Sequence, residues 1–349
     1  MVTGGAGFIG CNFIHFLLAE EGFAGRVVNL DLLTYAGNPL NLKNIEDKFG
    51  NTRYKFIHGD INDRVLVENI FNEYEVDTVV HFAAESHVDR SILSPEDFLK
   101  TNVMGTLALL DVSRNVWKER QDVLFHHIST DEVYGSLGET GFFREDTPYS
   151  PRSPYSASKA ASDHLVMAYY HTYGLPVTLS NCSNNYGPYQ FPEKLIPLMI
   201  INMLEEKTIP VYGDGKNKRD WLYVEDHARA VLSILKNGKI GEKYNIGGEN
   251  EWENIKLLET LIGIFVKKTG KNIDKIRSTI AFVKDRPGHD RRYAIDCGKI
   301  KRELGWKQTV SFEERLEKTV DWYLANTAWI DNIRGGEYKN WTEKNYEKR

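Results

Sequence analysis

Short apolar runs alternate with amphipathic stretches through the first two-fifths of this 349-residue chain. The runs at 26–30, 53–57, 78–82 and 123–128 are rich in β-branched and aromatic residues, which is typical of buried strands. Helical patterns separate them, and a longer helical pattern at 155–173 precedes another strand-like run at 177–181. Such alternation indicates right-handed crossovers and a parallel sheet covered by helices. The chain is therefore predicted to be α/β, with a doubly wound parallel sheet of Rossmann type.

The alternation of strands and helices ends after about residue 185, where loops rich in Gly, Asn and Pro begin. We interpret residues 1–185 as the Rossmann-type domain, to which the region 211–231 partly returns. Residues 186–330 are predicted to form a smaller mixed α/β lobe, and residues 331–349 a peripheral tail. Because only three residues precede the first glycine loop, we also expect that residues upstream of Met1 are missing from this record.

Charge and composition exclude several classes of protein. Lys and Arg total 44 against 49 Asp and Glu, a net charge of −5, so a nucleic-acid partner is not expected. The longest apolar stretch, 195–204, is too short to span a bilayer, and no basic leader opens the chain, so neither membrane insertion nor secretion is expected. The three cysteines form no disulfide framework, which favours the cytoplasm.

The glycine loop is the first candidate ligand site. Gly4, Gly7 and Gly10 form GxxGxxG, and Gly5 overlaps it as GxGxxG. Glycines allow a tight turn and let the backbone approach a pyrophosphate at a helix N-terminus. Alone this pattern also fits a structural turn, but Asp31 follows the next strand about 20 residues on, where an acid holds ribose hydroxyls. Since an acid repels a 2′-phosphate, NAD is favoured over NADP.

Two further strand ends support a dinucleotide site. Asp60 and Ile61 close the third strand, where they can contact adenine, and Ala83 and Ala84 close the fourth, where small side chains admit a dinucleotide. A lone aspartate after a strand is usually a turn cap. Three strand ends in register argue against that interpretation here.

Tyr155 and Lys159 are spaced to share one helix face. An ammonium near a phenol favours the phenolate and lowers the phenol pKa, which makes a base able to accept a hydroxyl proton. Before them, Thr130, Asp131 and Glu132 end a strand at the sheet edge where open α/β folds bind ligands. A simple oxidoreductase needs only the hydroxyl, Tyr155 and Lys159. Two added acids suggest proton removal together with protonation of a leaving group.

Other candidates are weaker. His126 and His127 alternate faces on a strand and are assigned to packing, as is Cys182. The triplet 225–227 fits a helix N-terminus, and no His/Cys cluster predicts a metal site.

Together these residues resemble the dTDP-glucose 4,6-dehydratases, in the extended short-chain dehydrogenase/reductase superfamily. The resemblance runs from Gly4 to about Trp329 and rests on segments 4–10, 83–91, 129–135, 155–159, 182–188, 219–221 and 285–296. The chain departs from the pattern in its short first strand and at Cys11, where serine is expected beside the pyrophosphate. The second departure could weaken one phosphate hydrogen bond.

The resemblance implies a role for each catalytic candidate. Thr130 hydrogen-bonds the sugar 4-hydroxyl, Tyr155 is its base, and Lys159 also holds the nicotinamide ribose. Glu132 takes the proton from carbon 5, and Asp131 protonates the departing 6-hydroxyl. The net reaction converts dTDP-glucose into its 4-keto-6-deoxy sugar, of the kind used to make rhamnose, and regenerates NAD in each turnover.

The resemblance also completes two binding sets. The predicted NAD contacts are Gly4, Gly7, Phe8, Ile9, Gly10, Asp31, Leu32, Thr34, Asp60, Ile61, Phe82, Ala83, Ala84, Ser86, Thr101, Tyr155, Lys159 and Asn185. The predicted nucleotide-sugar contacts are Ser86, Thr130, Asn184, Lys194, Leu195, Pro210, Val211, Tyr212, Arg219, Asn254, Asp285, Arg286, Pro287, Gly288 and His289. Lys194 and Arg219 suit a diphosphate, and Tyr212 can stack on a pyrimidine.

A homodimer is expected, with 98–116 and 155–173 pairing across a two-fold axis. These segments carry apolar residues predicted to lie off the sheet-facing stripe, namely Leu107, Leu110, Val166 and Tyr170. The nearest alternatives are a UDP-sugar 4-epimerase, which has no use for two carboxylates, and another nucleotide-sugar 4,6-dehydratase. A non-catalytic NAD-sensing protein would be expected to lack Thr130, Tyr155 or Lys159, and all three are present.

Overall fold

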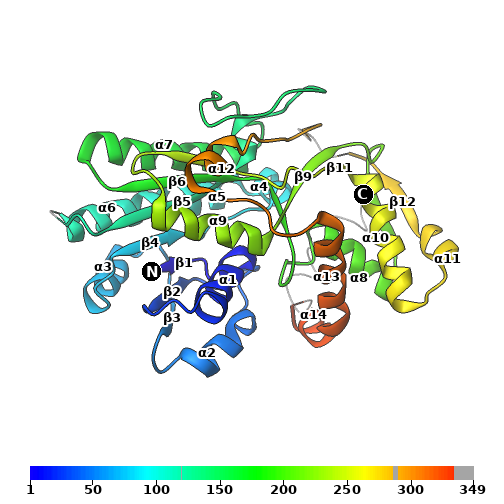
Figure 1. Ribbon diagram of the computed structural model, residues 1–349, viewed down its shortest axis with the longest axis horizontal. Coiled ribbons are helices and arrows are strands. Elements are labelled where there is room, and N and C mark those ends of the chain that lie inside the picture. The colour runs from blue at the N-terminus through cyan, green and yellow to red at the C-terminus, as the bar shows by residue number, and fades with distance from the viewer. Residues whose placement is uncertain (119, 286–289, 334–349) are drawn as a thin grey trace.

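Seven parallel strands form the central sheet of the protein (Figure 1). The computed structural model describes residues 1–118, 120–285 and 290–333. The strand order is β10 (Lys243–Ile246), β6 (Val177–Cys182), β5 (Leu124–Thr130), β4 (Thr78–His81), β1 (Val2–Thr3), β2 (Val27–Asp31) and β3 (Tyr54–His58). Every neighbouring pair in this sheet is parallel. The predicted doubly wound α/β fold is confirmed.

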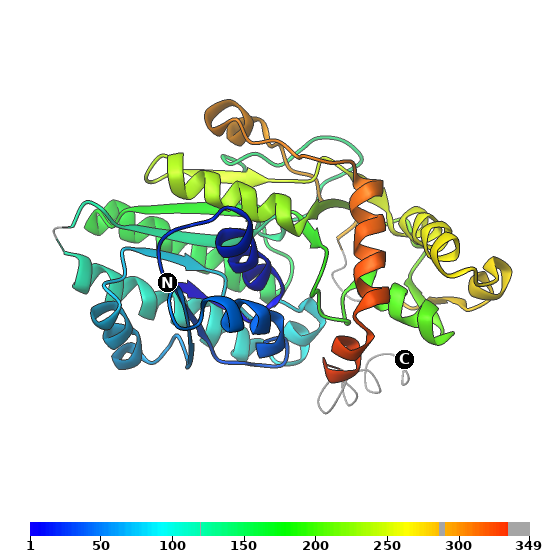
Figure 2. The same ribbon diagram turned by 60° about the horizontal axis from the view of Figure 1, so that its bottom comes forward.

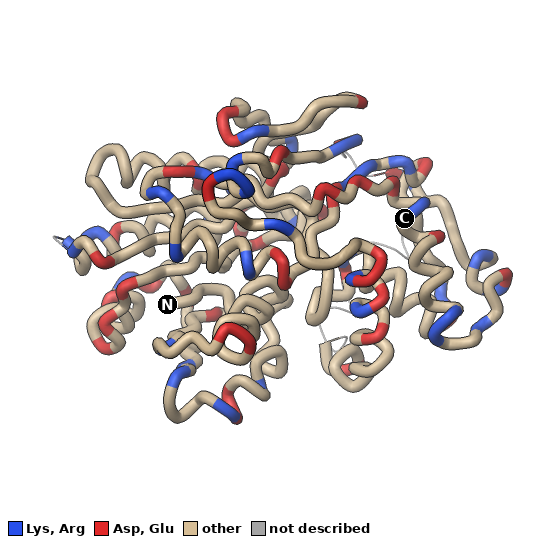
Figure 3. Tube along the Cα trace, viewed as in Figure 1, with Lys and Arg blue, Asp and Glu red and all other residues tan. Residues whose placement is uncertain are grey.

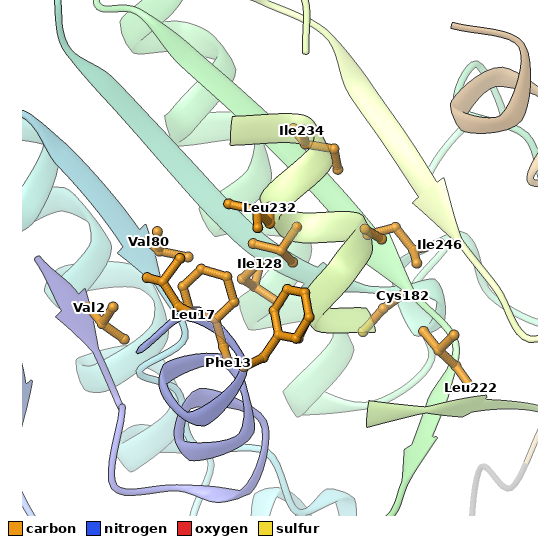
Figure 4. Close-up of a cluster of buried hydrophobic side chains, with 14 of the residues drawn as sticks. Val2, Phe13, Leu17, Val80, Ile128, Cys182, Leu222, Leu232, Ile234 and Ile246 are labelled. Atoms are coloured by element: carbon orange, nitrogen blue, oxygen red, sulfur yellow. The ribbon is translucent and has the colours of Figure 1, made fainter. Parts of the chain in front are cut away.

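Helices cover both faces of the sheet, as the two ribbon views agree (Figures 1 and 2). One face carries α3 (Arg64–Glu73), α6 (Thr106–Trp117) and α7 (Pro154–Tyr173), whose side chains share one apolar core with the strands. The other face carries α1 (Phe8–His15), α2 (Lys43–Phe49) and α9 (Val224–Asn237). Figure 4 shows Phe13 and Leu17 lying against Val80 and Ile128 of the strands, with Leu232 of α9 nearby.

The prediction that four apolar residues lie off the sheet-facing stripe is wrong for two of them. Leu110 and Val166, predicted to lie away from the sheet, are fully buried inside this chain. The reason is that α6 packs on both α3 and α7, so its apolar residues are covered from two sides. Leu107 and Tyr170 are only partly buried beside the same core.

Local chemistry sets the ends of the elements that reach the sheet edge. A capping box between Ser153 and Ser156 begins α7, with Pro154 at its first position, and Gly174 ends it in a left-handed conformation. Helix α1 passes directly into a π-helical turn at Phe16–Glu20, so the helical stretch after the glycine loop runs to residue 20. The region around 88–105 forms α4 (Val88–Leu93), α5 (Pro95–Phe98) and a π-helical segment, Leu99–Gly105.

The remaining elements form a smaller lobe on the right of Figure 1. They pair as a three-stranded sheet of β7, β9 and β11 and a two-stranded sheet of β8 and β12, packed with α8, α10 and α13 around a second apolar core. Their bounds are β7 (Asn184–Tyr186), α8 (Leu195–Glu205), β8 (Ile209–Tyr212), β9 (Lys218–Tyr223), β11 (Glu251–Glu253), α10 (Asn254–Thr269), α11 (Ile273–Arg277), β12 (Ile280–Val283), α13 (Phe312–Ala325) and α14 (Thr327–Ile333). Helix α12 (Gly298–Leu304) instead packs on β10 and α9 beside the main sheet (Figure 1).

The chain does not divide at residue 185 in a simple way. Strand β10 lies within the range expected for the lobe, yet it pairs with β6 at the edge of the main sheet. At the other end, Trp329 of α14 donates its indole N–H to Asn41 Oδ1, 2.7 Å away, on the Rossmann side. Most of the predicted tail, 334–349, lies outside the described residues.

Charges of both signs are intermingled along the trace in Figure 3. Within the described residues, no helix is both long enough and apolar enough to cross a membrane.

Candidate active site

A cleft of about 290 Å³ opens at the carboxyl ends of the central strands. All eighteen residues of the predicted NAD set line it, from the glycine loop to Asn185. All five catalytic candidates, Thr130, Asp131, Glu132, Tyr155 and Lys159, line it as well. The fold thus brings residues from eight separate segments into one cleft, while their individual roles stay predictions.

The glycine loop is shaped for close backbone approach. Gly4 has φ +70°, and a Cβ built there would lie 2.5 Å from the Ala83 nitrogen of the neighbouring strand end. A Cβ on Gly10 would lie 2.4 Å from the Gly4 carbonyl oxygen. Gly7 is the N-cap of α1 and provides no side-chain cap, and residues 7–10 of this helix start line the cleft, where a pyrophosphate could bind the uncapped amides. The loop therefore fits a dinucleotide.

Asp31 ends β2 at the wall of this cleft. Its Oδ2 accepts a hydrogen bond from the Ala6 amide and its Oδ1 from the Leu33 amide, both at 2.8 Å. These bonds orient the carboxylate, although burial raises its pKa above the ordinary value. Asp60 is held differently, since its Oδ1 accepts from the backbone and the side chain of Asn62 at 2.9 Å.

Cys11 does not lie beside the cleft as expected. Its side chain is fully buried in the core, and its Sγ donates to the Phe8 carbonyl at 3.2 Å. The side chain points away because position 11 faces the sheet side of α1. The departure from the family pattern at position 11 therefore changes a contact in the apolar core and not a contact with a phosphate.

The end of β5 holds two acids in unequal surroundings. Thr130 Oγ1 accepts from the Glu132 amide at 3.3 Å and donates to Asp131 Oδ1 at 3.4 Å, so it starts the 3₁₀ turn Asp131–Tyr134. Asp131 is buried, whereas Glu132 is half-exposed. Burial, followed by the charge of Glu132, raises the pKa of Asp131 well above its usual range. Asp131 is therefore suited to hold a proton at neutral pH, next to a carboxylate able to accept one.

Lys159 reaches back to the strand from α7. Its Nζ donates to the Ile128 carbonyl oxygen at 2.8 Å and lies 3.4 Å from His127 Nε2. Burial lowers the pKa of Lys159 to about 8. The prediction that Lys159 lowers the pKa of Tyr155 is wrong for the protein without cofactor or substrate. Burial, followed by Glu132, raises the pKa of Tyr155 well above its ordinary value.

The predicted nucleotide-sugar contacts fall into three groups. Ser86, Thr130, Asn184 and Lys194 line the cleft, and Lys194 Nζ donates to the Ser86 carbonyl at 3.2 Å. Outside its lining are Leu195, Pro210, Val211, Tyr212, Arg219, Asn254 and Asp285. The last four predicted residues, Arg286, Pro287, Gly288 and His289, lie outside the described residues.

Two of the lobe residues outside the cleft lining, Val211 and Arg219, are held in place by their neighbours. Val211 is 2% exposed, because its side chain packs in the lobe core. Arg219 is fixed in place, with its guanidinium donating to the Lys218 and Asp290 carbonyls at 2.7 and 2.9 Å and lying 4.6 Å from the Tyr293 ring centre.

Sequence reasoning missed several residues that line the cleft. They include Tyr35, Glu85, Gln190, Phe191 and Glu193, and also Cys182, which had been assigned to packing alone. These residues lie in loops just after strands or at a strand end, and that position is the only signal that could have indicated them. Within the described part of the chain, no group of three His, Cys, Asp or Glu side chains could hold a metal.

The fold and the cleft define a nucleotide-binding α/β protein of the short-chain dehydrogenase/reductase class. Comparison with known proteins narrows the class. The family described as GDP-mannose 4,6 dehydratase matches residues 1–319. The chain therefore belongs to this family.

Individual relatives are similar over their full length. The chain is 54% identical to a dTDP-glucose 4,6-dehydratase from Xanthomonas campestris pv. campestris, covering 97% of both chains. It is 52% identical to that of Salmonella typhimurium, covering 100% of this chain and 99% of the relative. A crystal structure of dTDP-glucose 4,6-dehydratase from Streptomyces venezuelae with NAD bound has a TM-score of 0.87 at 46% identity, covering 95% and 98%. The predicted resemblance is confirmed.

Proposed function

We propose that the protein catalyses the NAD-dependent dehydration of dTDP-glucose to dTDP-4-keto-6-deoxyglucose. The observation that carries the proposal is the pair Asp131 and Glu132 beside Thr130 and Tyr155 in one cleft. A 4-epimerase needs a base for one hydroxyl, whereas elimination of water needs a second base and an acid. The similarity to dTDP-glucose 4,6-dehydratases across whole chains supports the same conclusion.

The residues of the cleft divide the chemistry among them. Thr130 and Tyr155 bind the sugar 4-hydroxyl, and Tyr155 accepts its proton. When bound, NAD supplies a positively charged ring that accepts hydride from carbon 4 and later returns it to carbon 6. The resulting 4-ketone acidifies the proton on carbon 5, so Glu132 can remove it. Asp131, kept protonated by burial, gives its proton to the departing 6-hydroxyl.

The lobe is proposed to bind the nucleotide. Lys194 at the cleft and Arg219 at 6% exposure place two cations on the lobe side of an otherwise acidic protein, which suits a diphosphate. Tyr212 is proposed to stack on the pyrimidine. The product belongs to deoxysugar biosynthesis of the rhamnose type, and three free buried cysteines support a cytoplasmic location.

Incubation with dTDP-glucose and with UDP-glucose in separate reactions tests the proposed activity. We expect the dTDP-sugar product to have lost one water and to carry a ketone, as read by mass spectrometry and borohydride trapping. Conversion of UDP-glucose to an isomer of unchanged mass would instead identify an epimerase.

Glu132→Gln tests the division of labour between the two acids. The amide keeps the shape but cannot accept a proton, so elimination should slow by roughly 10²–10⁴-fold. Oxidation at carbon 4 should persist, seen as near-ultraviolet absorbance of the reduced dinucleotide on mixing with substrate. Exchange of the carbon-5 proton with deuterated solvent should fall in step with elimination.

Asp131→Asn is the matched variant for that experiment. It keeps Glu132, so carbon-5 exchange should be less impaired than elimination. The assignment is mistaken if Glu132→Gln forms product at the normal rate, or if it also prevents oxidation at carbon 4.

Asp31 is proposed to set the preference for NAD over NADP. The double variant Asp31→Ala with Leu32→Arg should accept NADP, because a 2′-phosphate then meets a guanidinium instead of a carboxylate. Leu32→Arg alone is the control and should keep the preference for NAD. Equal use of both cofactors by the unaltered protein would contradict the role of Asp31.

The protein is proposed to be a homodimer built on the segments 98–116 and 155–173. Support comes from Leu99 and Met104, which are 52% and 51% exposed on the first of these segments. Met104→Asp should give a monomer by light scattering at micromolar concentration, while Phe282→Asp on the exposed face of the lobe should leave the dimer intact. An unaltered protein that is already monomeric would refute this proposal.

A further inference from the structure

Asp163 lies behind the catalytic candidates on the same face of α7. Tyr155, Lys159 and Asp163 are spaced four residues apart, so all three face the sheet. Asp163 is 1% exposed, which makes a carboxylate at this position costly unless it is compensated. It does not line the cleft, so it can act only through other residues.

Three donors, two from strands and one from a loop, hold one oxygen of this carboxylate. Ser129 Oγ of β5 and the Tyr149 hydroxyl each donate to Asp163 Oδ2 at 2.8 Å, and Asn181 Nδ2 of β6 donates at 3.3 Å. This arrangement fixes the rotation of the carboxylate. The other oxygen, Oδ1, is thereby directed toward the sheet, where it lies 3.3 Å from His127 Nε2.

His127 stands between Asp163 and Lys159. The same ring nitrogen, Nε2, lies 3.4 Å from Lys159 Nζ and 3.3 Å from Asp163 Oδ1, and the imidazole is fully buried. Burial lowers the pKa of His127 well below its usual range, so the ring is neutral. Because an ammonium can only donate, Nε2 accepts the hydrogen bond from Lys159. Asp163 Oδ1 lies close to the same nitrogen but makes no hydrogen bond there, so it acts on Lys159 through its charge.

Lys159 needs a nearby negative charge to stay protonated. Burial lowers its pKa to about 8, and among its surroundings Asp163 is the largest influence in the opposite direction. The other titratable groups around it are His127 on β5, His81 on β4 and the Cys182 thiol on β6. Tyr149, Tyr134 and Lys243 face Asp163. None of these carries a negative charge near neutral pH. Burial raises the pKa of Asp163 itself, while Lys159 and the three donors to Oδ2 act against that rise and favour the carboxylate, so Asp163 is the counter-charge.

We propose that Asp163 is a positioning residue that, across His127, keeps Lys159 charged and directed at the Ile128 carbonyl. The effect of Asp163 on the charge of Lys159 does not depend on the proposed function. The catalytic use of that charge rests on the proposed function, in which the ammonium supports the Tyr155 base and holds a ribose.

Asp163→Asn tests the inference, because the amide preserves size and removes the charge. In protein labelled with ¹⁵N-lysine, the Nζ signal of Lys159, assigned by its loss in Lys159→Arg, should titrate about 1 pH unit or more lower than in the unaltered protein. The alkaline limb of kcat/KM should move down equally, since Lys159 loses its proton earlier. Asp163→Glu should restore most of both shifts.

Asp226→Asn is the control for loss of a buried carboxylate. Asp226 is 2% exposed on α9 and accepts from Thr309 Oγ1, away from Lys159, so neither titration should move. A folded Asp163→Asn protein with an unshifted Lys159 titration overturns the inference.

If Asp163→Asn does not fold, Tyr149→Phe and Ser129→Ala take its place. Each removes one donor to Asp163 Oδ2 and should lower the Lys159 titration by a smaller amount; no shift in either also overturns the inference. Because the Nζ titration needs no substrate, a protein without dehydratase activity would refute only the proposed function.

Discussion

The hydrogen bond from Lys159 Nζ to the Ile128 carbonyl ties helix α7 to strand β5, and the active cleft depends on that junction. It sets the position of Tyr155, one turn earlier on the helix, relative to Thr130, two residues later on the strand. The strand then ends in the turn that holds Asp131 and Glu132. Helix and strand therefore deliver five catalytic candidates to one place without any of them lying on a long loop.

Exclusion of water has opposite effects on the charged groups of the cleft. Burial raises the pKa of Asp131 and of Tyr155 and lowers that of Lys159, because each loses hydration of its charged form. In the proposed mechanism Asp131 benefits, since an acid must keep its proton. Lys159 and Tyr155 would need added charges, which we propose that Asp163 and NAD, when bound, supply. The same low dielectric thus creates the acid and imposes the need for a counter-ion.

Several expectations failed where packing, not local pattern, was decisive. Helical periodicity predicts Leu110 and Val166 to lie off the sheet-facing stripe, because it cannot reveal that α6 is covered by two other helices; both are buried. Cys11 was placed beside a phosphate, although the turn of α1 directs it into the core. Strand β10 was assigned to the lobe, because a four-residue strand far along the chain carries no signal of its partner. Lobe residues such as Val211 and Arg219 followed only from resemblance.

By itself, the sequence determined the alternation of strands and helices as far as residue 181, the glycine loop and the residues Asp31, Asp60 and Thr130 that follow or end strands, because these features are local in the chain. Periodicity and turn chemistry act over a few residues and can be read directly. Only the tertiary structure decided which acid is buried, where Lys159 points and that Asp163 stands behind it. Those properties depend on contacts between segments far apart in the chain, whose burial and charge no local pattern records.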